Sequence, residues 1–263
     1  MNEGASGIIK EKVTGRPDIF LKEFYADYLW DLFCSGCQIP VVARIFAEAL
    51  DEIGVGDRAI MVTGVGCSGI LMGGVIVDRV SAAHGRPQDV ATAIKRIYPE
   101  TVVFTVQGDG DCIAIGAGAF IGALSRGEKI TIIMVNNTNF GMTGGQMAPT
   151  TIIGQQTTTS PSGRDIVAEG YPTHAAEIAA TFKGVAFSAR GALHTPASYQ
   201  QAKGYIRTAF QRQRDNVGTT FVEIITACPT NWHLSPEQSL AYIRDNIIPE
   251  FPLGEFKNVT HVE

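Results

Sequence analysis

Two apolar runs that each end in a polar tip constrain the fold of this chain more than any other feature. Residues 101–107 are β-branched or apolar at nearly every position and stop at Gly-Asp-Gly-Asp, residues 108–111. Small residues predict a helix over 112–125, and the apolar run 129–135 ends at Asn-Asn-Thr-Asn, residues 136–139. Strands without a polar face are typical of parallel sheets that helices cover on both sides. The segment therefore predicts a βαβ unit in an α/β domain with a mostly parallel sheet.

The polar tips of these two strands are expected side by side, because open α/β sheets bring the carboxyl ends of neighbouring strands to one edge. Asp109 and Asn137 can then meet. A carboxylate, a side-chain amide and a backbone carbonyl suit Mg²⁺, which also keeps substrate phosphate oxygens among its ligands. Gly108 and Gly110 let the backbone approach those phosphates, and a helix beginning near Asp111 offers free N–H groups to an anion. The alternative is a Gly/Asp turn followed by an unrelated Asn-rich turn.

The Gly-Asp-Gly and Asn-Asn sequences at this spacing resemble the motif shared by enzymes that use thiamine diphosphate. The resemblance implies that Asp109 and Asn137 bind Mg²⁺ through their side chains, and Asn139 through its backbone carbonyl. The continuation Phe-Gly-Met-Thr-Gly-Gly-Gln, residues 140–146, is similar to the β subunit of 2-oxoacid:ferredoxin oxidoreductases of the 2-oxoisovalerate or 2-oxoglutarate type. The resemblance covers about residues 30–235 and implies the diphosphate-binding domain of that family.

The same resemblance implies which residues contact the cofactor. His84 lies in a His-Gly-Arg segment that, in this family, is near the thiazolium ring and the substrate, so it is the catalytic candidate. A surface or core histidine is the alternative. The cofactor-binding set is Gly66, Cys67, Ser68, His84, Gly108, Asp109, Gly110, Asp111, Asn137, Asn139, Gly141, Met142 and Thr143.

A glycine turn after another apolar run allows a different interpretation. Residues 64–69, Gly-Val-Gly-Cys-Ser-Gly, match GxGxxG after a short predicted strand. A dinucleotide site would need a helix that opens at the third glycine and an acidic residue at a strand end about 20 residues later. Residues 70–74 are a poor helix, Asp78 comes too early, and Asp89 lies in a polar turn that contains proline. A nicotinamide site is therefore the less favoured alternative.

Four of the five cysteines fall at a predicted element end or in a glycine turn: Cys34, Cys37, Cys67 and Cys228. A Cys-x-x-Cys pair with two distant cysteines fits either a zinc site or a [4Fe-4S] cluster, and spacing alone does not separate them. The family resemblance implies the cluster, since oxidation without NAD or lipoamide needs a one-electron acceptor near the thiazolium ring. Cys112, among Ala and Ile, is expected to be a packed apolar residue.

Composition excludes several classes of partner. With 263 residues and 45% apolar content, the chain can bury one large core. A net charge of -5 gives no broad basic field, so neither nucleic acid nor an anionic membrane is an expected partner. The start of the sequence lacks an apolar signal segment, and no apolar run reaches the roughly 18 residues of a membrane span. We therefore expect a cytoplasmic protein.

The order of elements predicts an N-terminal arm over 1–30, a cofactor- and cluster-binding domain over 31–235, and a C-terminal helix with an exposed tail over 236–263. Further helices are expected at 39–53, 88–97, 175–181 and 196–212, and further strands at 58–63, 185–188 and 219–226. Residues 147–171 form a long polar loop, which is interpreted either as a lid over a site or as a mobile surface excursion.

The resemblance implies a function for the chain as part of a complex. The family converts a 2-oxo acid and coenzyme A to acyl-CoA and CO₂ while it reduces ferredoxin. Family enzymes take the Glu that activates the aminopyrimidine ring from a second domain, so an α subunit is the expected partner. Further expected partners are a γ subunit, a ferredoxin-like δ subunit and external ferredoxin.

The identity of the 2-oxo acid rests on one residue. Ile70 stands where some relatives that use 2-oxoglutarate have a basic residue, which favours an apolar, branched-chain 2-oxo acid. Two other functions stay open. One is half of a non-oxidative thiamine diphosphate decarboxylase or synthase, and the other is a zinc-stabilised scaffold subunit.

Overall fold

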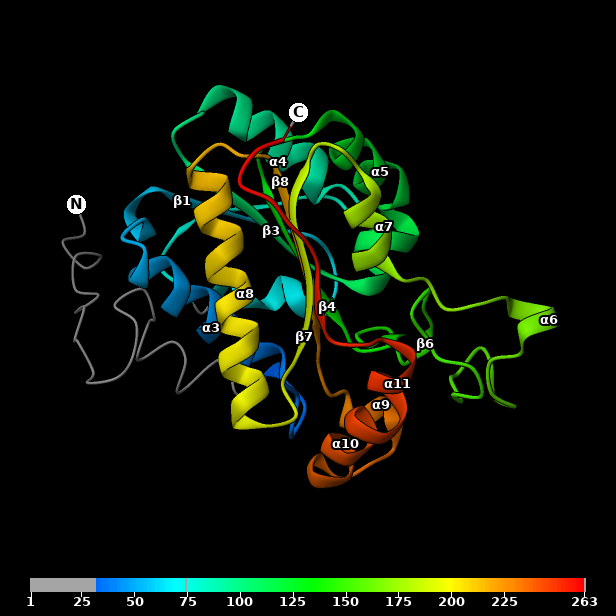
Figure 1. The fold of residues 1–263 in the computed structure, drawn as a ribbon. Coiled ribbons are helices and arrows are strands. Elements are labelled where there is room, and N and C mark those ends of the chain that lie inside the picture. The colour runs from blue at the N-terminus through cyan, green and yellow to red at the C-terminus, as the bar shows by residue number, and fades with distance from the viewer. Residues whose placement is uncertain (1–31, 74, 263) are drawn as a thin grey trace, which may run out of the picture.

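A sheet covered by helices forms the centre of the molecule (Figure 1). The computed structural model describes residues 32–73 and 75–262, so the arm predicted over 1–30 lies outside the described residues. The sheet has seven strands in the order β2-β1-β3-β4-β8-β7-β9, and all neighbours are parallel except β9, which is antiparallel to β7. Its strands are β1 Ala59–Thr63, β2 Asp78–Ser81, β3 Val102–Gly108, β4 Thr131–Asn136, β7 Val185–Ala192, β8 Thr219–Ile225 and β9 Gly254–Asn258. A separate hairpin pairs β5 Asn139–Phe140 with β6 Gln146–Met147. The α/β prediction is confirmed.

Helices cover both faces of the sheet (Figure 1). On one face lie α3 (Ile39–Glu52) and α8 (Pro196–Arg214), and on the other lie α4 (Pro87–Ile97), α5 (Ala117–Arg126) and α7 (Ala175–Thr181). Proline at the first turn begins α3, α4 and α8, where its missing N–H costs no helical hydrogen bond. The remaining helical segments are 3₁₀ turns Gly56–Arg58 and Cys67–Gly73, π-helical turns Gly110–Ile115 and Ile243–Ile247, α6 Ile166–Glu169, α9 Pro229–Trp232, α10 Pro236–Tyr242 and α11 Ile248–Glu250.

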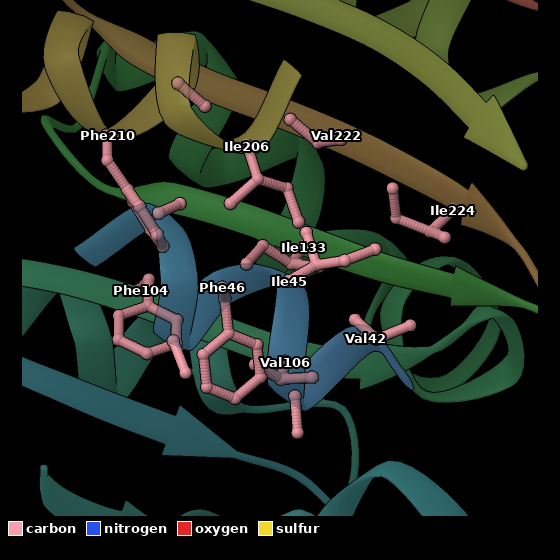
Figure 2. Packing of buried hydrophobic residues seen from close by; sticks show 14 of the residues in the cluster. Val42, Ile45, Phe46, Phe104, Val106, Ile133, Ile206, Phe210, Val222 and Ile224 are labelled. Atoms are coloured by element: carbon pink, nitrogen blue, oxygen red, sulfur yellow. The ribbon is translucent and has the colours of Figure 1, made fainter. Parts of the chain in front are cut away.

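Successive residues of the central strands face two separate apolar layers. In β3, Phe104 and Val106 belong to the layer beneath α3 and α8, whereas Val103 belongs to the layer beneath α4, α5 and α7. The ring centroid of Phe104 lies 5.3 Å from that of Phe46 and 5.2 Å from that of Phe210 (Figure 2). One strand residue thus joins both helices of its face. Because both layers are apolar, the strand sequence shows no polar alternation.

The topology brings four strand ends together. Strands β1, β3, β4 and β8 are parallel neighbours, so their carboxyl ends share one edge of the sheet. The chain order reverses between β1 and β3, and ligands of open α/β sheets bind at such a reversal. Strand β3, helix α5 and strand β4 form the predicted βαβ unit.

The helix predicted over 112–125 is divided in two. A π-helical turn covers Gly110–Ile115, and α5 begins only at Ala117. At the break, a side chain on Gly116 would lie 2.5 Å from the backbone oxygen of Asp111, so this position admits only glycine. The wide turn lets the segment around Gly85 pack directly against the helix. Wide turns of this kind often mark functional sites.

The predicted edges of the sheet are also wrong in two places. Residues 78–81, where no strand is predicted, form β2, a short exposed edge strand that pairs with β1. The C-terminal segment, expected to be an exposed extension, returns as β9 beside β7. Neither strand has an apolar pattern in the sequence, because each is an edge strand with little buried surface. The strand expected at 185–188 continues to Ala192.

Candidate functional site

A pocket lies at the carboxyl ends of β1, β3 and β4. Its lining contains the complete set of residues predicted to contact thiamine diphosphate, and in addition Ile39, Val65, Val135 and Phe140. The tertiary structure therefore brings the predicted set into one site. Ile70 is half-buried and lies outside this lining. The part that each lining residue takes in binding stays a prediction.

Asp109 is buried in the wall of this pocket with few donors around it. Its side chain accepts a hydrogen bond from the backbone N–H of Gly110 at 2.8 Å and another from the hydroxyl of Thr150. Burial raises the pKa of the Asp109 carboxyl to about 7, although both hydrogen bonds act in the opposite direction. A carboxylate so poorly solvated at a pocket wall can be stabilised by a cation.

The loop after β4 is held in a tight conformation. Thr138 has φ of 58°, a left-handed conformation that a β-branched residue rarely adopts. Its backbone N–H donates to Oδ1 of Asn136 at 3.0 Å, and Nδ2 of Asn139 donates to the backbone oxygen of Asn137 at 2.8 Å. Such strain is often found where a loop has to present ligands.

His84 and Asp111 form a pair at the wall of the pocket. Nδ1 of His84 contacts Oδ1 of Asp111, and the backbone N–H of Gly85 donates to the same oxygen at 2.7 Å. Nε2 of Gln107 donates to Oδ2 of Asp111 at 2.8 Å. His84 is one-third exposed, whereas the Asp111 side chain is buried. Asp111 thus lines the pocket while both of its oxygens are already bonded to the protein.

The four cysteines predicted as ligands come from three distant segments and gather beside the pocket. Burial, with the charges of Cys34, Cys67 and Cys228 as smaller causes, raises the pKa of the Cys37 thiol to about 12. Burial and the charges of Cys228 and Cys34 raise the pKa of Cys67 to about 11. Burial also raises the pKa of Cys228. Two of the sulfurs lie beside the loop after β4: a side chain on Gly141 would lie 3.5 Å from the sulfur of Cys67, and the sulfur of Cys228 is 3.8 Å from Oδ1 of Asn139.

No group of three or more His, Cys, Asp or Glu side chains within residues 32–73 and 75–262 is arranged as a ready-made metal site. The fifth cysteine is separate from the other four. Cys112 is fully buried in the layer beneath α4 and α5, where Nε2 of Gln88 lies 3.3 Å from its sulfur. Its expected role as a packed apolar residue agrees with this position.

Two amides that the sequence analysis did not single out hold the cysteine segments in place. Gln38 donates from Nε2 to the backbone oxygen of Leu193 at 2.7 Å and accepts from the backbone N–H of Ala227 at 2.9 Å. Nδ2 of Asn231 lies 3.4 Å from the sulfur of Cys228 and donates to the backbone oxygen of Gly141 at 2.9 Å. Their nearness in sequence to Cys37 and Cys228 was the available signal.

Indole Nε1 of Trp232 also donates a hydrogen bond, to the backbone oxygen of Asn137 at 3.2 Å. The short helix α9 after Cys228 therefore contacts the loop that carries Asn137 and Gly141. One element joins the cysteine segment to the predicted magnesium ligands, over a long separation in sequence.

The loop over residues 147–171 contributes to the site and is organised by one arginine. Thr150, which belongs to this loop, is the hydroxyl donor to Asp109. The buried guanidinium of Arg164 donates to backbone oxygens of Pro149, Thr151, Glu169, Gly170 and Tyr171. The distal part of the 147–171 loop, which contains α6, extends away from the sheet (Figure 1). Whether the loop acts as a lid stays a prediction.

Comparison with known proteins gives matches along most of the chain. Residues 64–224, more than half of the chain, match the family model of the thiamine pyrophosphate enzyme C-terminal TPP binding domain. The ketoisovalerate oxidoreductase subunit VorA of Methanothermobacter thermautotrophicus is 39% identical over 226 residues, which cover 86% of this chain and 47% of the relative. The 2-oxoglutarate synthase subunit KorB of Archaeoglobus fulgidus is 35% identical over 231 residues, which cover 86% of this chain and 82% of the relative. The chain therefore spans about half the length of VorA.

A solved structure has the same fold. The 2-oxoglutarate:ferredoxin oxidoreductase from Magnetococcus marinus, with 2-oxoglutarate, coenzyme A and succinyl-CoA bound, superposes with a TM-score of 0.69. The match covers 92% of this chain and 88% of that chain, at 21% sequence identity. In the part of the chain that the structure describes, no helix combines the length and the apolar character needed to cross a membrane.

Proposed function

Because the chain belongs to the thiamine pyrophosphate enzymes, and among them to the 2-oxoacid:ferredoxin oxidoreductase subunits, we propose that it carries the redox centre of such an enzyme. The reaction is oxidative decarboxylation of a 2-oxo acid to acyl-CoA and CO₂, with reduction of ferredoxin. One observation carries the proposal: Asp109, Asn137 and Asn139 line one pocket with Cys67, and the sulfur of Cys228 lies 3.8 Å from Oδ1 of Asn139.

The pocket residues fit magnesium and a diphosphate. A side chain at Gly108 or Gly66 would meet no protein atom within 4 Å, so both glycines border open space in the pocket that a ligand can fill. The Asp109 carboxylate would gain a counter-ion there, with Asn137 and the carbonyl of Asn139 as further oxygen ligands. Bound thiamine diphosphate supplies the carbon nucleophile and the electron sink that decarboxylation of a 2-oxo acid requires.

The four cysteines fit a [4Fe-4S] cluster. The thiols of Cys37, Cys67 and Cys228 are costly to ionise because they are partly buried, and binding to iron offsets the cost of these thiolates. Sulfur donors suit zinc equally well, but a zinc ion accepts no electrons. Relatives named as ferredoxin oxidoreductases favour a site that passes electrons singly.

An apolar 2-oxo acid suits the pocket best. Among the described residues that line it, none is Lys or Arg, so this lining has no lysine or arginine to pair with a second carboxylate. Ile39, Val65 and Met142 instead supply apolar surface. The substrate class that this lining favours is a branched-chain 2-oxo acid. The sequence analysis favours the same class on the basis of Ile70, which lies outside the pocket lining.

The complex is completed by other chains. An α subunit supplies the pyrimidine-binding domain and its activating Glu, and γ and δ subunits and external ferredoxin complete electron transfer. The matched relative VorA, about twice as long as the matched region, is consistent with a second domain working beside this one. We expect the purified single chain to be inactive.

The test is anaerobic purification of the native assembly. We expect thiamine diphosphate in an acid extract, iron with acid-labile sulfide, and CoA-dependent reduction of a viologen dye that is faster with 3-methyl-2-oxobutanoate than with 2-oxoglutarate or pyruvate. Thiamine diphosphate without iron would instead identify a non-oxidative decarboxylase or synthase. Zinc without thiamine diphosphate would identify a scaffold subunit.

A further inference from the structure

We propose that Asp111 does not bind the cofactor, and that it is the positioning residue that fixes the ring of His84 so that Nε2 is available to the 2-oxo acid. The inference deepens the proposed function and rests on it. It also changes the role predicted for Asp111 from the sequence, where the residue belonged to the cofactor-binding set.

The carboxylate of Asp111 has no free side for a ligand. Its Oδ1 receives the N–H of Gly85 and contacts Nδ1 of His84, and its Oδ2 receives the amide of Gln107. A side chain on Gly64 would collide with Oδ2, so the backbone of the glycine turn covers that oxygen. The side chain is only 1% exposed. A metal or a diphosphate would have to displace these groups to reach it.

The same contacts set the tautomer of His84. Both oxygens of Asp111 accept hydrogen bonds, from Gly85 and Gln107, so we assign the hydrogen of this pair to Nδ1 of His84. Among the described residues, none bonds Nε2 of His84, while the ring lines the pocket and is 33% exposed. Nε2 is therefore the ring atom left for a ligand.

Asp111 contacts the histidine segment at two points, the ring of His84 and the backbone N–H of Gly85. Gly85 has φ of +76°, and a side chain there would lie 2.6 Å from the backbone of Ile115. The turn therefore packs directly on the π-helical segment that carries Asp111. A histidine held at two points loses little freedom when it contacts a substrate, which is how an orienting carboxylate aids a reaction.

The first test compares Asp111→Asn with Asp109→Asn in the assembled complex. Thiamine diphosphate is measured by acid extraction and by equilibrium binding, and folding by circular dichroism. Losing even a hydrogen-bonded partner of a metal ligand typically costs about ten-fold or more in affinity, so we expect Asp109→Asn to weaken cofactor binding by at least about that factor and Asp111→Asn to change it by about two-fold at most. Equal losses in two folded variants would overturn the proposal.

The second test does not depend on cofactor binding. Diethyl pyrocarbonate modifies an accessible histidine nitrogen, and peptide mass spectrometry measures its rate at each histidine separately. We expect Asp111→Asn to change the rate at His84 and not at His174, which has its own carboxylates, Glu177 and Glu250. An unchanged rate at His84 would overturn the proposal, even if the parent complex contained no thiamine diphosphate.

A pair of histidine variants covers the case in which Asp111→Asn does not fold. The amide nitrogen of Asn occupies the place of Nδ1, and that of Gln the place of Nε2. We expect His84→Asn to keep the melting temperature and bound cofactor of the parent but to lose about 100-fold in kcat, the order contributed by a positioned acid–base group. His84→Gln should melt lower and keep more activity. Full activity of His84→Asn, or identical behaviour of the two variants, would contradict the assignment.

Discussion

Nδ2 of Asn136 donates a hydrogen bond to Oε1 of Glu223 over 2.7 Å, and both side chains are fully buried. The other oxygen of Glu223 accepts from Nε of Arg190 at 2.8 Å. The residue directly before Asn137 is therefore anchored to a buried ion pair between β7 and β8. This pair lies behind the site and fixes the origin of the loop that carries the predicted magnesium ligands.

We expect Glu223→Leu to lower the free energy of unfolding by about 3 kcal/mol, because it leaves Asn136 without its acceptor and Arg190 with one carboxylate partner fewer. Chemical denaturation of the purified complex measures this. Glu52→Leu is the control: its half-exposed carboxylate pairs with Lys203 on the surface, so about 0.5 kcal/mol or less is expected. Equal losses would show that Glu223 is not an anchor.

The ion pair between Arg190 and Glu177 is expected to make the stability of the fold depend on pH. Burial alone would raise the pKa of Glu177, but the hydrogen bonds and charge of Arg190 outweigh it and lower the pKa below 4.5. A carboxyl with a lowered pKa in the folded state stabilises the fold above its unfolded value of 4.5 and loses this contribution as pH falls through the folded value.

We therefore expect the melting temperature to fall below pH 4.5 less steeply in Glu177→Gln than in the parent. Thermal melts over a series of acidic buffers measure the slope. The exposed Glu237→Gln serves as control and should follow the parent. A parent slope retained by Glu177→Gln would refute this role of the pair with Arg190.

The side chain of Asn231 is expected to affect the reduction potential of the proposed cluster. Its Nδ2 lies 3.4 Å from the sulfur of Cys228, and a donor to a cluster sulfur stabilises the reduced form. A hydrogen bond of about 1 kcal/mol corresponds to roughly 40 mV for one electron, so Asn231→Ala should lower the potential by tens of millivolts. Redox titration followed by electron paramagnetic resonance measures it. The exposed Asn246→Ala should keep the parent potential; a shift of the same size there would remove the argument.

A substitution at Gly108 is expected to weaken cofactor binding without lowering the stability of the fold. A methyl group at this position meets no protein atom within 4 Å and borders the pocket, so Gly108→Ala should melt like the parent and bind thiamine diphosphate at least about ten-fold more weakly. Isothermal titration calorimetry measures the affinity. Gly118→Ala, on the exposed side of α5, should bind normally and gain about 0.5 kcal/mol of stability. Unchanged binding by Gly108→Ala would place the cofactor elsewhere.

Part of this site was predictable because the residues that indicate it lie close together in the sequence. Apolar runs without a polar face indicated buried parallel strands, and parallel strands end at one edge whatever their exact order. Asp109 and Asn137 follow directly from two such ends, so their meeting needed only the βαβ unit. The four cysteines predicted as cluster ligands were marked by their places at element ends, and the packed Cys112 by its apolar neighbours.

Other parts depend on contacts between distant segments, for which the sequence has no local signal. The donor from Thr150 to Asp109, the bonds of Asn231 to Gly141 and Cys228, and the pairing of β9 with β7 each arise from the packing of the whole chain. The two aspartates of the Gly-Asp-Gly-Asp turn make the difference plain.

The sequence by itself determined that Asp109 and Asp111 stand at a strand end beside a binding site. Only the tertiary structure decided that Asp109 borders the pocket with few partners, while Asp111 turns toward Gly85, Gln107 and His84. The physical reason is that a buried carboxylate adopts the direction in which donors satisfy both of its oxygens, and for Oδ1 of Asp111 those donors come from the distant turn that contains His84 and Gly85.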